Sequence, residues 1–301
     1  MIRASIVLLA LVVVPLTTAS AQQTANAQQQ VASAQPQTAS APQPTTSAPA
    51  AAQIQPAPKP PFPNRANTVL PAWLRVRGEF RERLEGFENS GFVPERDDSY
   101  ALSRVRLSAT ITPSKSLSFQ AQVQDARVAK KEVGPTAAPF RGPFDLRLGF
   151  SDIGGAKAPV AARLGRQELA FGEQRLLGHL AWVNTERSWD AARMILRAKG
   201  WQADVFGASL VRSLPDEFDK SGNGNRLAGV YAASANVIPQ AAVEPYVFWR
   251  RDVNLRSELG RGGTLSQTTI GTRVAGKLPA RLDYGVEMAL QRGGLAADSL
   301  N

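Results

Sequence analysis

Arginine recurs at every second residue in several parts of the chain, and this spacing is the strongest chemical signal in the sequence. In 73–84 and 99–111 the arginines alternate with apolar residues, so a strand would place the two kinds on opposite faces. A guanidinium stays charged at any working pH, and its planar fork fits a carboxylate. The arginines expected on this polar face are Arg75, Arg77, Arg81, Arg83, Arg104, Arg106, Arg163, Arg193 and Arg197. We expect an anion-attracting surface, with Glu79, Glu82 and Asp125 neutralising part of its charge.

Few residues could serve catalysis or metal binding. The chain has no cysteine, which excludes a thiolate nucleophile and a cysteine-ligated metal. A single histidine, His179, is too few for a multi-histidine metal site and argues against a Ser-His-Asp hydrolase. The sequence therefore predicts no enzyme, no cofactor and no metal site. It has 35 Lys and Arg against 25 Asp and Glu. This excess does not indicate nucleic-acid binding, because the arginines are interleaved with apolar residues.

Alternation with a period of two dominates the chain after Pro71 and predicts an all-β fold. Each segment makes one apolar and one polar sheet face, and its length suits a tilted membrane-spanning strand of about 10 residues. Eleven strands are predicted, at 73–84, 99–111, 116–127, 144–153, 159–167, 189–198, 201–212, 226–237, 242–252, 265–276 and 281–291.

The predicted connections alternate between long ones, of roughly 12–21 residues, and short ones, of roughly 2–5, as in outer-membrane barrels. A soluble sandwich gives the same strand pattern without this asymmetry. Trp73, Phe150, Trp201 and Trp249 lie near strand ends, where an aromatic girdle is expected. The sequence thus predicts an antiparallel up-and-down transmembrane β-barrel. Because a membrane barrel must close and eleven is odd, we expect a C-terminally incomplete barrel.

The first 70 residues differ in composition from the rest. Residues 1–21 combine an early Arg3, a short apolar run and Ala19-Ser20-Ala21, which predicts a cleaved signal peptide. Residues 22–70 are mostly Ala, Gln, Pro, Ser and Thr, which predicts a disordered linker. The barrel is expected at 71–301, in the outer membrane of a Gram-negative bacterium.

Two segments resemble the alginate-export family of bacterial outer-membrane barrels. The matching residues are Gly165, Arg166, Gln167, Glu168, Gly172, Arg175, Gly178 and Asp190. They correspond to a Gly-Arg-Gln-Glu-Leu strand end, a glycine-bounded loop and an aromatic-Asp-x-x-Arg strand. The resemblance implies a monomeric barrel of about 18 strands, of which this chain supplies about 11. It also implies an arginine-rich, electropositive lumen that passes an anionic polysaccharide.

Three functions remain open at this point. The first is passive transport of an anionic polysaccharide or oligosaccharide through a barrel in outer-membrane lipid. The second is a general or small-anion porin of the same fold, and the third is a structural or adhesion barrel. The first two differ in their constriction, which depends on whether the connections after 84, 127 and 167 fold inward.

Overall fold

The computed structural model describes residues 5–7, 64–214, 217–257, 260–278 and 282–295. The strands are β1 (Ser5–Val7), β2 (Leu74–Phe87), β3 (Asp98–Ser114), β4 (Leu117–Ala129), β5 (Gly142–Ile153), β6 (Val160–Gln167), β7 (Trp189–Ala198), β8 (Trp201–Arg212), β9 (Lys220–Ile238), β10 (Ala241–Arg256), β11 (Gly262–Leu278) and β12 (Leu282–Leu295). Two short 3₁₀ helices, η1 (Asn64–Thr68) and η2 (Ser90–Phe92), accompany them. None of the helices in these ranges has the length and apolar character needed to cross a membrane.

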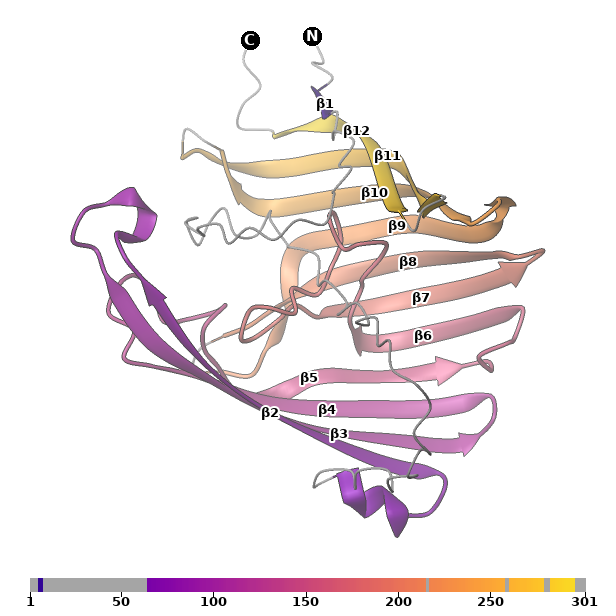
Figure 1. Cartoon of the computed structure of the whole chain (residues 1–301), viewed down its shortest axis with the longest axis horizontal. Coiled ribbons are helices and arrows are strands. Elements are labelled where there is room, and N and C mark those ends of the chain that lie inside the picture. The colour runs from indigo at the N-terminus through magenta and orange to yellow at the C-terminus, as the bar shows by residue number, and fades with distance from the viewer. Residues whose placement is uncertain (1–4, 8–63, 215–216, 258–259, 279–281, 296–301) are drawn as a thin grey trace, which may run out of the picture.

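The strands form one antiparallel up-and-down sheet, as predicted. From β2 to β12 each strand pairs with its neighbours in sequence, and Figure 1 shows the sheet curving between these two ends. All eleven predicted strands are present, and β9–β12 are longer than expected. β1 was not predicted; its Ser5–Val7 pair with Ala289–Gln291 of β12. Within the described residues, no pairing joins β2 to β12 or to β1.

The edge of β2 is covered at one point by a side chain. Asn67 of η1 donates from Nδ2 to the Val76 carbonyl at 2.7 Å and accepts from the Val76 N–H at 2.8 Å. The amide thus replaces a neighbouring strand at this position, which removes two unpaired edge groups. Residues 64–70, the end of the predicted linker, are therefore ordered. Residues 22–63 and most of the predicted signal peptide lie outside the described ranges.

The two faces of the sheet differ in chemistry. The inner face carries Arg104 and Arg106, which are buried at 4% and 6% exposure. The outer face carries Val105 and Leu107 between them, which are 44% and 51% exposed. Other exposed apolar residues of the outer face are Phe80, Leu84, Phe144, Leu146, Leu164, Met194, Ile270 and Met288. The predicted alternation is therefore confirmed, with the polar side turned inward.

Connection lengths follow the predicted asymmetry only in part. At one end of the sheet 88–97, 130–141 and 168–188 are long, whereas 213–219 and 257–261 are shorter than predicted because β9, β10 and β11 extend further. At the other end the strands are joined by 115–116, 154–159, 199–200 and 239–240. The Lys199–Gly200 turn has φ values of 49° and 81°. Two residues with positive φ are what a tight hairpin requires to match the strand twist.

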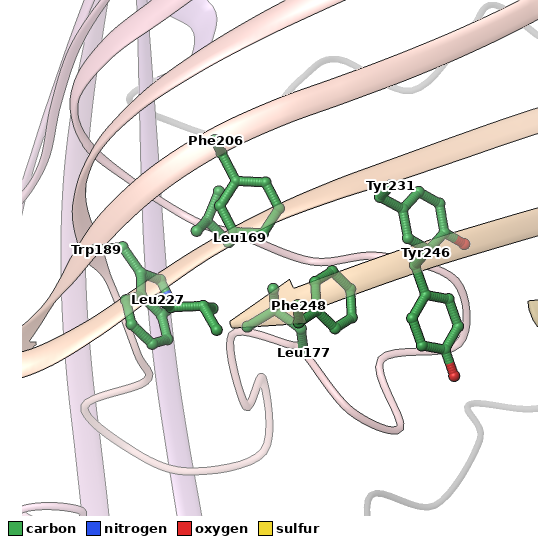
Figure 2. Packing of buried hydrophobic residues seen from close by; sticks show 8 residues of the cluster. All are labelled: Leu169, Leu177, Trp189, Phe206, Leu227, Tyr231, Tyr246 and Phe248. Carbon is green, nitrogen blue, oxygen red and sulfur yellow. The ribbon is translucent and has the colours of Figure 1, made fainter. Parts of the chain in front are cut away.

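The longest of these connections, 168–188, folds onto the inner face; we call it the inner segment. Its Leu169 and Leu177 pack against inward side chains of β7–β10, as Figure 2 shows. The strand residues of this cluster are Trp189, Phe206, Leu227, Tyr231, Tyr246 and Phe248. Phe171 of the inner segment stacks on Tyr231 with ring centroids 4.7 Å apart. This part of the inner face is aromatic, whereas the alternation predicted polar side chains on this face.

Candidate functional site

Strand register brings the nine predicted arginines to the inner face. Arg81 of β2 lies opposite Arg104 of β3, and Arg163 of β6 lies opposite Arg193 of β7. Side chains opposite each other in a ladder share a face. The remaining predicted arginines, Arg75, Arg77, Arg83, Arg106 and Arg197, alternate with outer-face residues in the same strands. The wall is therefore built by β2, β3, β6 and β7.

A buried ion network fixes the inner segment to this wall. Glu186 of the segment accepts from Arg104 at 2.7 Å, contacts Arg106 at 3.0 Å and accepts from Arg147 at 2.6 Å. Glu79 of β2 also pairs with Arg104, as expected from the sequence. The Glu186 side chain is only 4% exposed, and these guanidiniums offset the cost of burying it.

Arg147 was missed by the sequence reading, and a β-bulge explains its position. Val123 and Gln122 of β4 are adjacent, whereas their partners Leu146 and Leu148 on β5 have Arg147 between them. The extra residue reverses the alternation of β5 beyond this point. Phe150 consequently faces inward at 9% exposure, with the Arg163 guanidinium 4.0 Å from its ring centroid. The expectation that Phe150 belongs to an outer aromatic girdle is wrong.

Arg81 and Arg83 hold the backbone of the inner segment. Arg81 donates to the carbonyls of Ala181 at 3.1 Å, Trp182 at 3.3 Å and Val183 at 3.1 Å. Arg83 donates to the Trp182 carbonyl at 2.6 Å. Each guanidinium satisfies loop carbonyls that would otherwise lack partners on this face.

Asn184 adds a second anchor to the same stretch. Its side chain is 1% exposed and donates from Nδ2 to the carbonyls of Ser103, Arg127 and Phe140 at 2.9–3.1 Å. The stretch 181–184 is therefore held by β2 through Arg81 and Arg83, and by β3 and β4 through the carbonyls of Ser103 and Arg127.

The predicted arginines divide into paired and unpaired groups. Arg163 forms a two-point contact with Asp152 at 2.7 and 2.9 Å, and Arg193 pairs with Asp204 at 2.8 Å. In the described part of the chain, Arg75, Arg77, Arg81 and Arg197 make no ion pair. The uncompensated positive charge of the wall is therefore concentrated on these four.

Two predicted acidic partners lie elsewhere. Glu82 is exposed and belongs to the outer-face alternation of β2, between the inward Arg81 and Arg83. Asp125 pairs with Arg127 of its own strand at 2.8 Å, two residues along on the same face. The expectation that these carboxylates neutralise inner arginines is wrong. A strand of fixed period two gives them the opposite side.

The family-motif residues serve different parts of the fold. Gly165 of β6 has φ of +121°, and a Cβ there would lie 2.3 Å from the Gly149 carbonyl oxygen. Gln167 is fully buried and donates to the Ala191 carbonyl at 3.0 Å. Arg166 pairs with Asp190 of β7 at 2.9 Å. Together they fasten β6 to both neighbouring strands.

The other motif residues belong to the inner segment. Glu168 pairs with Arg147, and Glu173 pairs with Arg273 at 2.5 Å and with Arg175 at 2.9 Å. Gly172 has φ of +55°, and its α-carbon is close enough to Tyr231 and Glu244 that a side chain would crowd them. At Gly178 a Cβ would lie 2.7 Å from the Gln174 side chain. The motif thus shapes the segment and its contacts with the wall.

Two carboxylates of the inner segment, those of Glu168 and Glu173, are stabilised in their charged form. Burial would raise the pKa of Glu168, but the Arg147 guanidinium outweighs burial and holds that pKa below its usual range. Burial would also raise the pKa of Glu173, but the guanidiniums of Arg273 and Arg175 outweigh burial and lower that pKa. At neutral pH Glu168 and Glu173 therefore pair, as carboxylates, with Arg147 of β5 and Arg273 of β11.

Glu168, His179 and Glu186 place one possible metal-ligating atom each within 4.8 Å of one another. Both carboxylates already bind Arg147, and Glu186 also binds Arg104. A divalent cation would lie beside these guanidiniums and be repelled. The chemistry of the cluster fits an arginine–glutamate network rather than a metal centre.

The curved antiparallel sheet, with its apolar outer face and arginine-lined inner face, defines the class of outer-membrane β-barrel channels. The alginate export family model matches residues 72–299. The chain therefore belongs to the alginate export family, whose members are outer-membrane transport channels and not enzymes. This confirms the resemblance drawn from the sequence. No curated protein matches the chain.

Proposed function

We propose that this chain forms the wall of an outer-membrane conduit that passes an anionic, alginate-like polysaccharide by passive diffusion. The observation that carries the proposal is the row of inner-face arginines on β2, of which Arg75, Arg77 and Arg81 lack ion-pair partners in the described structure. A row of uncompensated guanidiniums attracts polymer carboxylates. Each exposed contact is weak enough to release them again.

The inner segment sets the width of the proposed path. It is fixed to β2, β3 and β5 by the Glu186 network and to β7–β10 by the aromatic cluster. An inward-folded connection narrows the interior, and its own carboxylates cover Arg104, Arg106 and Arg147. The polymer is therefore expected to follow the unpaired arginines beside the segment.

The outer face supports a location in lipid. Its exposed apolar side chains, such as Leu107 and Met288, alternate with inward polar ones. In our proposal residues 1–21 are a cleaved signal peptide, 22–63 a linker, and the barrel a monomer. Cleavage would remove β1 and leave the edge of β12 without it.

Ion selectivity in a planar bilayer tests the proposal. The refolded full chain should show a reversal potential that favours anions across a salt gradient. The variant Arg75→Gln/Arg77→Gln should lose much of this preference, because it removes two uncompensated charges that do not contact the inner segment. The control Asp152→Asn/Arg163→Gln removes one charge of each sign and should keep the preference.

Block by a polymer separates polysaccharide transport from a small-anion porin. A polyuronate should enter the wild-type channel and interrupt its current. A pore for small anions would not admit the polymer, and its current would continue. A wild-type channel without anion preference, or an Arg75→Gln/Arg77→Gln variant with unchanged selectivity, would overturn the proposal.

A further inference from the structure

Trp182 is a large aromatic residue held in an exposed position on the inner segment. Its side chain is 70% exposed. The guanidinium of Arg83 lies 4.2 Å from the ring centroid, within the range of a cation–π contact. Its Nε also pairs with Glu85 of the same strand at 2.5 Å, so Glu85 offsets part of its charge. One face of the indole is therefore occupied by a positive charge, and the high exposure leaves the other accessible.

The position of Trp182 is fixed through its backbone. Arg81 and Arg83 both donate to its carbonyl, and Asn184, two residues along, is buried among three backbone carbonyls. An exposed tryptophan ordinarily loses conformational freedom when it binds a ligand. Here the main chain is already held, so this cost is reduced.

Burial within the protein does not explain the side chain. The two exposed tryptophans of comparable exposure, Trp73 and Trp249, lie at the start of β2 and on the outer face of β10. Trp182 instead is bound by arginines of the inner face. It thus offers a flat apolar surface next to two guanidiniums on the polar side of the sheet, of which only Arg83 is paired with a carboxylate, that of Glu85.

We infer that Trp182 and Arg83 form a binding subsite for one acidic sugar residue, with the pyranose ring on the indole face away from Arg83 and its carboxylate at the ring edge, directed toward the guanidinium. The apolar C–H face of a pyranose complements an aromatic face, and a uronate carboxylate complements arginine. The inference rests on the proposed function, because that function supplies the acidic polysaccharide. It adds recognition of the sugar ring, which charge alone does not give.

Binding to the full chain refolded in detergent micelles tests the subsite, and it requires no closed pore. Hexagalacturonate is the acidic-sugar probe, maltohexaose the neutral one, and citrate an anion without a pyranose ring. Isothermal titration should show hexagalacturonate binding about 5- to 10-fold more weakly to Trp182→Leu than to wild type. Trp182→Phe should retain most of the affinity, and citrate binding should not change.

Controls separate stacking from structural damage. Trp249→Leu removes a similarly exposed indole from the outer face and should leave hexagalacturonate affinity unchanged. The backbone carbonyl that Arg81 and Arg83 bind is present in every variant, and hydrogen exchange of 181–184 should confirm that the segment stays in place. If the segment 181–184 loosens in Trp182→Leu, the hexagalacturonate affinity of Trp182→Phe is compared with that of wild type instead. A loss of affinity in Trp182→Phe as large as in Trp182→Leu then counts against stacking.

The outcomes distinguish this inference from the conduit itself. Equal hexagalacturonate affinity in wild type and Trp182→Leu, or an equal loss for citrate, would overturn the subsite while anion selectivity in the bilayer still supported the conduit. Failure of wild type to bind hexagalacturonate would also overturn it. A wild-type channel that shows no anion selectivity would overturn the proposed function.

Discussion

Arg166 and Asp190, two residues of the family motif, face each other directly across β6 and β7 with Nε and Oδ1 2.9 Å apart. Both follow the outer-face alternation, since Leu164 and Met194 lie on the same sides of their strands. Arg166 also donates to the carbonyls of Leu146 at 3.0 Å and Asp219 at 3.3 Å. One guanidinium therefore joins β5, β6, β7 and the connection 213–219, on the side away from the proposed path.

This arrangement predicts a structural role for the pair. Asp190→Asn should lower the free energy of unfolding by about 1–3 kcal/mol, because a half-buried guanidinium loses its charged partner. Chemical unfolding in detergent measures the change. The control Glu217→Gln affects an exposed ion pair with Lys220 and should have no measurable effect. An Asp190→Asn variant with normal stability but altered anion selectivity would contradict this assignment.

The alternation of polar and apolar residues was sufficient to predict most of the strands and their two faces. In β3 the residues Arg104, Val105, Arg106 and Leu107 take the sides expected from their order, because a regular strand has no other freedom. The prediction failed where the period breaks. The bulge at Arg147 turned Phe150 inward, and nothing in the composition of β5 marks the inserted residue.

The inward position of the inner segment could not be predicted from the sequence for a different reason. Arg104 and Glu186 are 82 residues apart, and their contact depends on a long connection folding inward rather than outward. Leu169, Phe171 and Leu177 were the available signal, since three large apolar residues in a loop need a surface to cover. Their partners on β7–β10 could be assigned only after the register was known.

Gly165 provides a test of close packing between β5 and β6. Gly165→Ala should destabilise the fold by about 1–3 kcal/mol, because φ of +121° is unfavourable for alanine and its Cβ would collide with the Gly149 carbonyl. The matched control is Gly207→Ala in β8, where a Cβ meets nothing within 4 Å. Equilibrium unfolding of both variants measures the difference. Equal stability of the two would show that β5 and β6 do not approach this closely.

The outer face can be tested with an introduced charge. Leu107→Arg should lower the free energy of unfolding in lipid bilayers by about 2–4 kcal/mol, as expected for a guanidinium near the bilayer midplane. Ser99→Arg places the same group on the same face at the end of β3, where the cost should be about 0–1 kcal/mol. Folding yields into vesicles over a urea series report both. A Leu107→Arg variant that folds into vesicles as stably as wild type would mean that this face does not contact lipid.

Acidification should release the inner segment before the rest of the sheet. The pKa of Glu168 and of Glu173 is lower in the folded chain than in the unfolded one, so both stabilise the fold fully above the unfolded value of about 4.3. That contribution is lost as the pH falls through the lower folded-state pKa, because protonation breaks the pairs with Arg147 and Arg273. Hydrogen exchange of 168–188, corrected for intrinsic rates, should be constant from pH 7 to about 5 and accelerate below about pH 4. In Glu168→Gln/Glu173→Gln the segment should exchange faster at pH 7 and show a smaller acid step, since the titrating groups are gone. An acid step of wild-type size in this variant would assign the release to other carboxylates.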